Sequence, residues 1–326
     1  MYEKEKEGKK KKRFKLFDSQ REGKGVTKEE ALLPPGLKKF FILYKRDFSR
    51  LLSVNILMVL GNFPVLFLIV ALSGLVSNEL VYPSNDAFGV FSGILEMEGY
   101  SAPTLALNGI LGSLGTANAY TPLTYLFFGL GALLFFTFGL VNVGTTYILR
   151  NMVKGEPVFV WSDFWYAIRR NLKQGFFFGI LDLLILLLIP YNVMLLTQGS
   201  GFGNGILFWL NIVFGLTYLA MRAYIYIQMV TFDLSIYKIL KNALIFSVVG
   251  FKRNFVAFLG KLFLVFITVI LAYSGVLLSL AIVLPFLLLL ANGAYMSTYA
   301  AYYKIEELMI KPYLKKQEEK SAVATE

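Results

Sequence analysis

The chain contains no cysteine and no histidine. It therefore cannot form disulfides, use a thiol nucleophile or imidazole acid–base chemistry, or assemble zinc sites of the usual kind. The sequence also lacks a GxxxxGK(S/T) nucleotide-binding loop, a GxSxG elbow and an HExxH pair. These absences predict that the protein is not an enzyme and that it holds neither a cofactor nor a metal ion.

Charged residues are also few, at 16%, whereas 56% of the residues are hydrophobic and the mean hydropathy is +0.61. Several uncharged runs exceed the ~18 residues that identify a membrane-spanning helix. Because these runs do not alternate, and because a backbone in hydrocarbon must satisfy its own hydrogen bonds, helices are favoured over a barrel. The sequence predicts an all-α, polytopic transmembrane bundle. Its six expected spans cover approximately residues 51–76, 123–148, 175–197, 206–230, 255–273 and 277–300.

Composition divides the chain into three parts. Residues 1–36 are rich in Lys and Glu and contain the basic run Lys9–Arg13, so they predict a disordered basic cytosolic tail with nothing from which to build a core. Residues 37–310 form the expected bundle, and its first part, up to residue 50, would lie among lipid headgroups. Residues 311–326 follow as a cytosolic C-terminal tail.

The distribution of Lys and Arg predicts the orientation, because positively charged loops stay in the cytosol. Residues 77–122 contain no Lys or Arg, whereas the connectors 150–174 and 231–254 are both basic. We therefore expect 77–122 to be an outer loop and both termini to be cytosolic. The net charge of +11 indicates contact with anionic lipid headgroups and not with nucleic acid, because the basic residues flank the apolar runs.

The first connector carries an amphipathic pattern. Gly144 predicts a helix break before it, and Ser162 or Asp163 is placed to cap the helix that follows. Five apolar residues recur at helical spacing and share one face of that helix: Trp161, Phe164, Trp165, Ile168 and Leu172. The helix either docks a cytosolic partner or lies at the interface with its tryptophans among the headgroups. The candidate partner surface consists of Arg150, Trp161, Asp163, Trp165, Arg169, Arg170 and Asn171.

Three charged residues fall inside predicted spans: Asp182, Arg222 and Lys261. At about 1.5 Å per residue they lie roughly 9 to 12 Å from the same membrane surface. Ionised groups at such depth usually pair, because an unpaired charge costs at least ~2.5 kcal/mol. We therefore expect Asp182 to pair with Arg222, Lys261 or both. The cluster would mark a substrate or ion path, or would be a structural ion pair beside a lysine that extends to the interface.

A resemblance to a known family rests on Asn55 and Pro64 in the first span and on three stretches around the first connector. These are TTYILRN after Gly144, FVWSDFW at 159–165 and RRNLKQ at 169–174. On these residues the chain resembles the YesL-like bacterial membrane proteins, a family without an established biochemical activity. The genes of that family often neighbour carbohydrate-uptake genes. The resemblance thus implies a place in the bacterial cell membrane and an accessory role beside a membrane transporter.

Two functional hypotheses follow. The first is a transport-related membrane subunit linked to carbohydrate uptake, which needs a polar path through the bundle. The second is a non-transporting membrane scaffold or regulator that anchors partner proteins. A water-filled cavity lined by the intramembrane polar groups would favour the first hypothesis over the second.

Overall fold

The computed structural model describes residues 33–83, 85–87, 89, 93, 101–111, 114–274, 283 and 288–323. Most of these residues are helical, which confirms the predicted helical class. The predicted tail 1–36 lies almost wholly outside the described residues. The chain divides into two compact units, a larger one of Met1–Gly61 with Thr137–Glu326 and a smaller one of Asn62–Phe136.

The number of spans is lower than predicted in the part of the chain that the structure describes. Four helical stretches are long and apolar enough to cross a membrane. There is a fifth candidate span only if the helices α2 (Leu37–Gly61) and α3 (Pro64–Leu72) form one broken span. The count of six is therefore not confirmed. The first part of the sixth predicted span, 277–300, falls outside the described residues up to 287, apart from residue 283, and most of the remainder belongs to α14 (Leu290–Ile305). The four helical stretches that are long and apolar enough by themselves are Pro122–Lys154, Leu172–Gln198, Phe202–Thr231 and Phe251–Tyr273.

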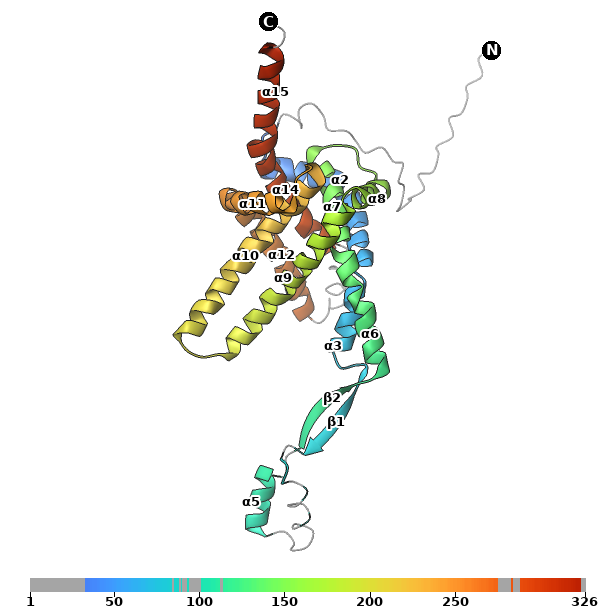
Figure 1. Cartoon of the computed structure of the whole chain (residues 1–326), viewed down its shortest axis with the longest axis vertical. Coiled ribbons are helices and arrows are strands. Elements are labelled where there is room, and N and C mark those ends of the chain that lie inside the picture. Colours follow the sequence, from blue (N-terminus) through green and yellow to red (C-terminus); the bar gives the residue numbers. More distant parts are fainter. Residues whose placement is uncertain are drawn as a thin grey trace, which may run out of the picture. The chain divides into compact units, whose positions relative to one another are not determined.

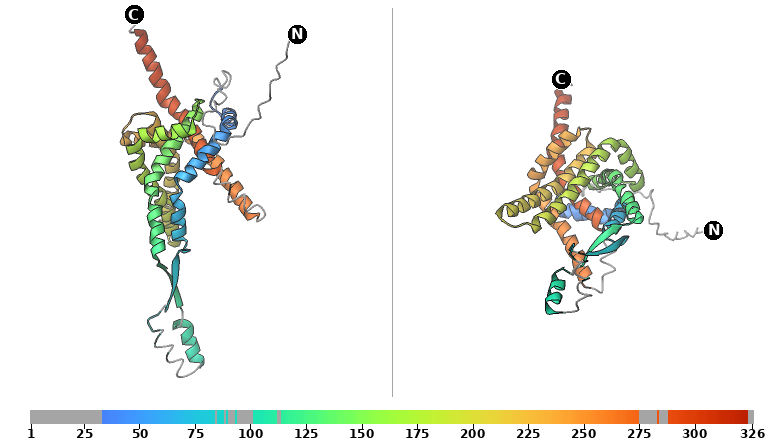
Figure 2. Two further views of the ribbon diagram at one scale, coloured as in Figure 1. Left: turned by 90° about the vertical axis from the view of Figure 1, so that its right-hand side faces the viewer. Right: turned by 60° about the horizontal axis from the view of Figure 1, so that its bottom comes forward.

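The larger unit consists of helices (Figure 1). The helices α9 and α10 form a helical hairpin, α11 occupies the second basic connector, and α14 packs against α2, α10 and α12. The last helix, α15, extends away from these helices in both views of Figure 2. Besides α2 and α14, the described helices are α7 (Leu134–Lys154, in this unit from Thr137), α8 (Val160–Arg170), α9 (Leu172–Gln198), α10 (Phe202–Thr231), α11 (Ile236–Val249), α12 (Phe251–Tyr273), the π-helix Glu306–Ile310 and α15 (Lys311–Val323).

Glycines line the crossing of α7 and α9. A Cβ atom added to Gly139 would lie 2.1 Å from the carbonyl oxygen of Gly175 and 2.4 Å from the Cα atom of Gly179. Gly175 and Gly179 form a GxxxG pattern, in which two glycines share one face of a membrane helix and let a second backbone approach. Because backbone meets backbone here, the crossing depends on the absence of side chains.

The break predicted at Gly144 is wrong. The helix α7 runs through Gly144 and ends only at Lys154. The glycine instead makes room for α8, because a Cβ atom at Gly144 would lie 2.5 Å from the ring of Phe164. Gly144 thus positions α8 on α7, and this requirement for space cannot be read from the spacing of residues along the chain.

A different glycine ends α7. Gly155 has a φ angle of +82°, which side-chain-bearing residues rarely adopt. Its N–H donates to the carbonyl oxygen of Met152 (3.1 Å), and the N–H of Glu156 donates to that of Asn151 (3.0 Å). These two bonds form a Schellman motif, which satisfies the last carbonyl groups of a helix. Gly155 therefore turns the chain out of α7 toward α8.

The smaller unit contains a feature that the all-α prediction missed. Strands β1 (Ser77–Pro83) and β2 (Leu114–Tyr120) pair antiparallel, with Ser77 opposite Tyr120 and Pro83 opposite Leu114. The other described elements are α3, which packs against α6 (Pro122–Ala132), and α5 (Ala102–Leu111). Strand β1 (SNELVYP) does not alternate apolar and polar residues, and the short alternation in β2 (LGTANAY) uses Ala, Asn and Gly, which are uncommon in strands.

Two threonines join the hairpin to α6. The hydroxyls of Thr121 and Thr124 both donate to the carbonyl oxygen of Val76, at 2.6 and 2.5 Å. Thr121 is also the N-cap of α6, and its hydroxyl accepts from the N–H of Thr124 (3.2 Å). Part of the predicted outer loop 77–122 is therefore regular structure, and these bonds hold the two ends of the hairpin together at the start of α6.

Candidate functional site

The buried carboxylate of Asp182 on α9 is the centre of a polar cluster. Its side chain is 0% exposed, and its hydrogen-bond partners Tyr218, Arg222 and Tyr226 all come from α10. Arg222 binds it in two places, with Nε donating to Oδ1 (2.6 Å) and Nη2 donating to Oδ2 (2.8 Å). Tyr218 donates its hydroxyl to Oδ1 (2.8 Å), and Tyr226 donates to Oδ2 (2.7 Å). Each oxygen therefore accepts two hydrogen bonds, which fills the four acceptor positions of a carboxylate.

The spacing of the donors explains how one helix supplies them all. Tyr218, Arg222 and Tyr226 follow one another at intervals of four residues, so they project from the same face of α10. The guanidinium carbon of Arg222 also lies 5.6 Å from the ring centre of Tyr226 and 5.5 Å from that of Phe138. A two-point Arg–carboxylate contact with aromatic neighbours is the strongest form of such an ion pair. The predicted pairing of Asp182 with Arg222 is present, and the two tyrosines were not predicted.

Lys261 does not join this cluster. It makes no hydrogen bond or ion pair with any residue that the structure describes, and its aliphatic carbons lie beside Gly293 of α14. The predicted set of three charges is therefore an ion pair and a separate lysine. The physical reason is that residues of α10 already occupy every acceptor position of Asp182, while α12 packs against α14.

Arg150 was predicted to belong to a partner surface, and this prediction is wrong. The residue is only 8% exposed. Its Nη1 donates to the carbonyl oxygen of Val230 (2.9 Å) and the hydroxyl of Thr231 (3.1 Å), and its Nη2 donates to Oδ1 of Asn151 (2.7 Å). The last carbonyl groups of a helix lack partners within the helix and attract cations. Arg150 therefore fastens the end of α10 to α7.

A second buried carboxylate, Asp47 on α2, was missed by the sequence interpretation. It is 0% exposed and pairs with Arg46 (2.7 Å) and Arg50 (3.0 Å). Arg46 also donates to the carbonyl oxygen of Met152 (3.0 Å), near the end of α7. One side of this segment packs inside the unit through Phe40, Leu43 and Asp47, whereas Leu37, Phe41 and Phe48 are exposed. The available signal was the acid between two arginines in the stretch KRDFSR.

The helix α8 has one buried and one exposed side. Phe164, Ala167 and Ile168 are buried, whereas Trp161 is 59% exposed and Trp165 is 42% exposed. The two indole rings meet edge to face, with ring centres 5.9 Å apart. The prediction of one shared apolar face is therefore only partly right. The buried face of α8 is narrower than the predicted apolar face, so the tryptophans lie at its edge. Leu172 is not part of this helix, because α9 begins at that residue.

Asp163 and Asn171 serve α8 itself. The predicted cap at Ser162 or Asp163 is wrong, because α8 begins earlier, at Val160, with Phe159 as its N-cap. Oδ2 of Asp163 instead accepts the N–H of Phe159 (2.9 Å) from within the first turn. Partial burial raises the pKa of the Asp163 carboxyl, and the hydrogen bond from Phe159 and the charge of Arg150 oppose this rise. Nδ2 of Asn171 donates to the carbonyl oxygen of Ala167 (3.0 Å) at the other end of the helix.

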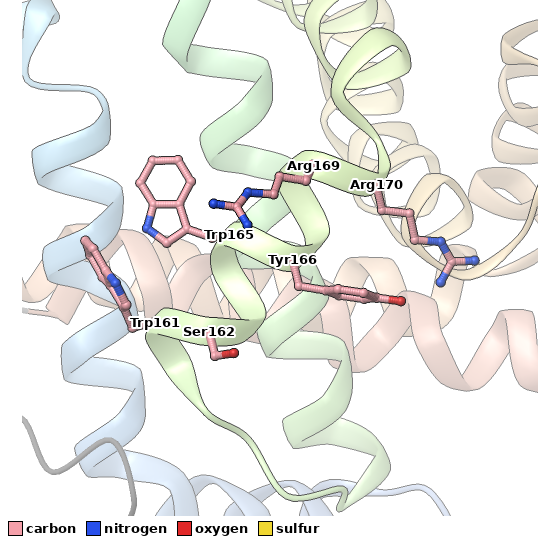
Figure 3. A pocket seen from close by; sticks show the side chains of 6 residues that line it. All are labelled: Trp161, Ser162, Trp165, Tyr166, Arg169 and Arg170. Atoms are coloured by element: carbon pink, nitrogen blue, oxygen red, sulfur yellow. The ribbon is translucent and has the colours of Figure 1, made fainter.

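An open depression runs along the exposed side of α8 (Figure 3). Arg169 extends toward Trp165, whereas Tyr166 and Arg170 lie on the other side of the helix in that view. Of the predicted partner surface, the exposed residues are thus the tryptophans and these two arginines. The residues that line the depression are Trp161, Ser162, Trp165, Tyr166, Arg169 and Arg170.

These features define a mostly helical protein with several helices long and apolar enough to span a membrane. No family model matches the chain, and no curated protein and no solved structure shows significant similarity to it. The resemblance to YesL-like proteins remains a prediction from the sequence. Function must therefore be argued from the geometry of the polar cluster and of α8.

Proposed function

We propose that the protein is a non-transporting scaffold or accessory subunit of the bacterial cell membrane. The observation that supports this role is the closed hydrogen-bond set around Asp182. Both oxygens of this buried carboxylate are fully occupied by donors from α10. A substrate or ion that used Asp182 would have to displace Arg222 or a tyrosine, at the cost of leaving a buried charge without its partner. The cluster thus suits a fixed joint between α9 and α10 better than a transport path.

The second candidate function is a transport-related subunit linked to carbohydrate uptake. It is favoured by Lys261, which lies inside the candidate span Phe251–Tyr273 and has no counter-ion among the described residues. Charged groups without partners in membrane helices often mark ion or substrate paths. The lysine is not a hydrogen-bond or ion-pair partner of Asp182, so a path through Lys261 would not require that pair to break.

Uptake by reconstituted protein separates the two functions. We expect vesicles that contain the purified chain to take up labelled mono- and oligosaccharides no faster than protein-free vesicles, with or without an ion gradient. A membrane transporter that co-purifies from native membranes in mild detergent would then identify the accessory role. Sugar uptake that requires the protein and is lost in the Lys261→Met variant would contradict the scaffold proposal and support the second candidate.

The proposed orientation can be tested directly, because the chain has no cysteine of its own. We expect Asn85→Cys to react with a membrane-impermeant thiol reagent on intact cells, because the segment 77–122 faces outward in the proposal. Lys154→Cys should react only after the membrane is opened. The cysteine-free parent is the control for background labelling. Labelling of Lys154→Cys, but not of Asn85→Cys, on intact cells would reverse the orientation.

A further inference from the structure

The exposed side of α8 is held in a fixed position relative to a candidate membrane span. A single residue, Asn171, separates the end of α8 from the start of α9 at Leu172. The buried side is packed on α7 through Phe164 over Gly144, and the Tyr147 and Tyr166 rings lie 5.6 Å apart. Rotation of α8 would break these contacts, so the side that carries the tryptophans and arginines stays outward.

The charge on this side is not compensated by any residue that the structure describes. Arg169 and Arg170 are exposed, and neither makes an ion pair or hydrogen bond with a described residue. The nearest acid along the helix, Asp163, is only partly exposed and already accepts the N–H of Phe159. Two guanidinium groups are therefore available for an external anion, and guanidinium binds phosphate oxygens in pairs.

The two tryptophans indicate which kind of anionic molecule binds beside the arginines. Trp161 and Trp165 are large, partly exposed and placed beside Arg169, with Ser162 adjacent in the same depression. Tryptophan is enriched where headgroups meet acyl chains, because its ring is apolar and its indole N–H is a donor. Binding of an acidic soluble protein would account for the exposed arginines. It would not account for a pair of tryptophans about two helical turns before the candidate span that begins at Leu172.

We propose that the exposed side of α8 is a binding site for the phosphate group of anionic phospholipids. Arg169 binds the phosphate beside Trp165, Arg170 adds positive charge at the start of α9, and the two indole rings contact the glycerol and upper acyl region. The proposal rests on the membrane location proposed above. It does not depend on whether the protein transports a substrate.

The tryptophans themselves provide the measurement. The chain has 3 tryptophans, so Trp209→Phe leaves Trp161 and Trp165 as the only tryptophans, whose emission is excited selectively at wavelengths that tyrosine does not absorb. This full-length variant is reconstituted into phosphatidylcholine vesicles that contain an equal fraction of either brominated phosphatidylglycerol or brominated phosphatidylcholine. We expect stronger quenching by the anionic brominated lipid, and we expect added salt to reduce the difference because screening weakens the attraction.

The variant Arg169→Gln/Arg170→Gln, in the same background, tests the assignment. It should reduce the preference for the anionic lipid several-fold, because one basic residue changes affinity for an anionic surface by about fivefold. Quenching by brominated phosphatidylcholine should persist, since the helix stays at the interface. Lys315→Gln/Lys316→Gln on α15 removes the same charge from another exposed helix and should leave the preference unchanged.

Three results would overturn the proposal. Equal quenching by the two brominated lipids in the parent would exclude selectivity for the anionic headgroup. A preference that survives the double arginine change would place the site elsewhere. No quenching by either lipid would show that α8 does not meet the bilayer and would leave an acidic protein as the partner of the arginines. None of these outcomes bears on sugar uptake, so this proposal and the proposed function fail separately.

Discussion

Replacing Asp182 by Asn is expected to lower the stability of the protein in detergent by about 3 kcal/mol, because removing one member of a buried ion pair leaves the other charge without compensation. Asn has nearly the same shape, so the change removes charge and little volume. Arg222 would remain beside the hydroxyls of Tyr218 and Tyr226. Their oxygens can accept hydrogen bonds, but they carry no negative charge to compensate the guanidinium. The midpoint of thermal unfolding, followed by the loss of monodisperse protein, measures the effect.

A double-mutant cycle identifies the partner. Asp182→Asn combined with Arg222→Gln should recover part of the lost stability, because the uncompensated charge is then absent. Asp182→Asn combined with Lys261→Gln should show weaker coupling, since Lys261 makes no hydrogen bond or ion pair with the carboxylate and interacts with Arg222 only through the repulsion of like charges. Asp163→Asn on the partly exposed helix α8 is the matched control and should have a small effect. Equal coupling to Arg222 and Lys261, or coupling to neither, would contradict the observed pairing.

Replacing Gly179 by Ala is expected to destabilise the crossing of α7 and α9 by about 3 kcal/mol, at the upper end of the usual cost of overpacking. The new Cβ atom would lie 2.3 Å from the Cα atom of Gly139, and backbone atoms of two packed helices cannot move aside as a side chain can. Thermal unfolding in detergent again measures the change. Gly139→Ala should have a similar effect, because it adds a methyl group to the same contact.

Alanine substitutions at two other glycines serve as controls for this test. Gly175→Ala should cost less than Gly179→Ala, because its Cβ atom would meet a side-chain atom, Cγ2 of Val143, at 2.8 Å. Gly205→Ala on α10 should be neutral or slightly stabilising, since nothing lies within 4 Å of its added Cβ atom and Ala favours helix. If Gly179→Ala is as well tolerated as Gly205→Ala, the two helices do not pack as closely as the structure shows.

The helical class and the pairing of Asp182 with Arg222 could be predicted from the sequence for the same physical reason. Hydrocarbon forces the backbone into helices, and a helix rises by a constant ~1.5 Å per residue, so depth in the membrane follows from counting residues. Equal depth on consecutive spans then brings the two charges to the same level.

Which residues at the same depth contact one another depends on how the helices pack. Counting residues placed Lys261 at the depth of Asp182, but helix packing put α12 beside α14 and let Tyr218 and Tyr226 of α10 fill the remaining acceptor positions. Packing also explains Gly144, because the ring of Phe164 lies where a side chain at this position would be. No periodicity in a single segment contains this information, because it concerns which face of one helix meets which face of another.

The sequence by itself determined that this is a mostly helical protein with several helices long and apolar enough to span a membrane and with basic connectors between them, because hydropathy and charge are patterns along the chain. Only the tertiary structure decided which charged residues are buried and which are exposed. Arg150 and Asp47 looked like surface residues, yet both lie inside, where free carbonyl groups at helix ends and neighbouring arginines compensate their charge. Arg169 and Arg170 remain outside because no such partner reaches them, and that difference arises from contacts between segments distant in the chain.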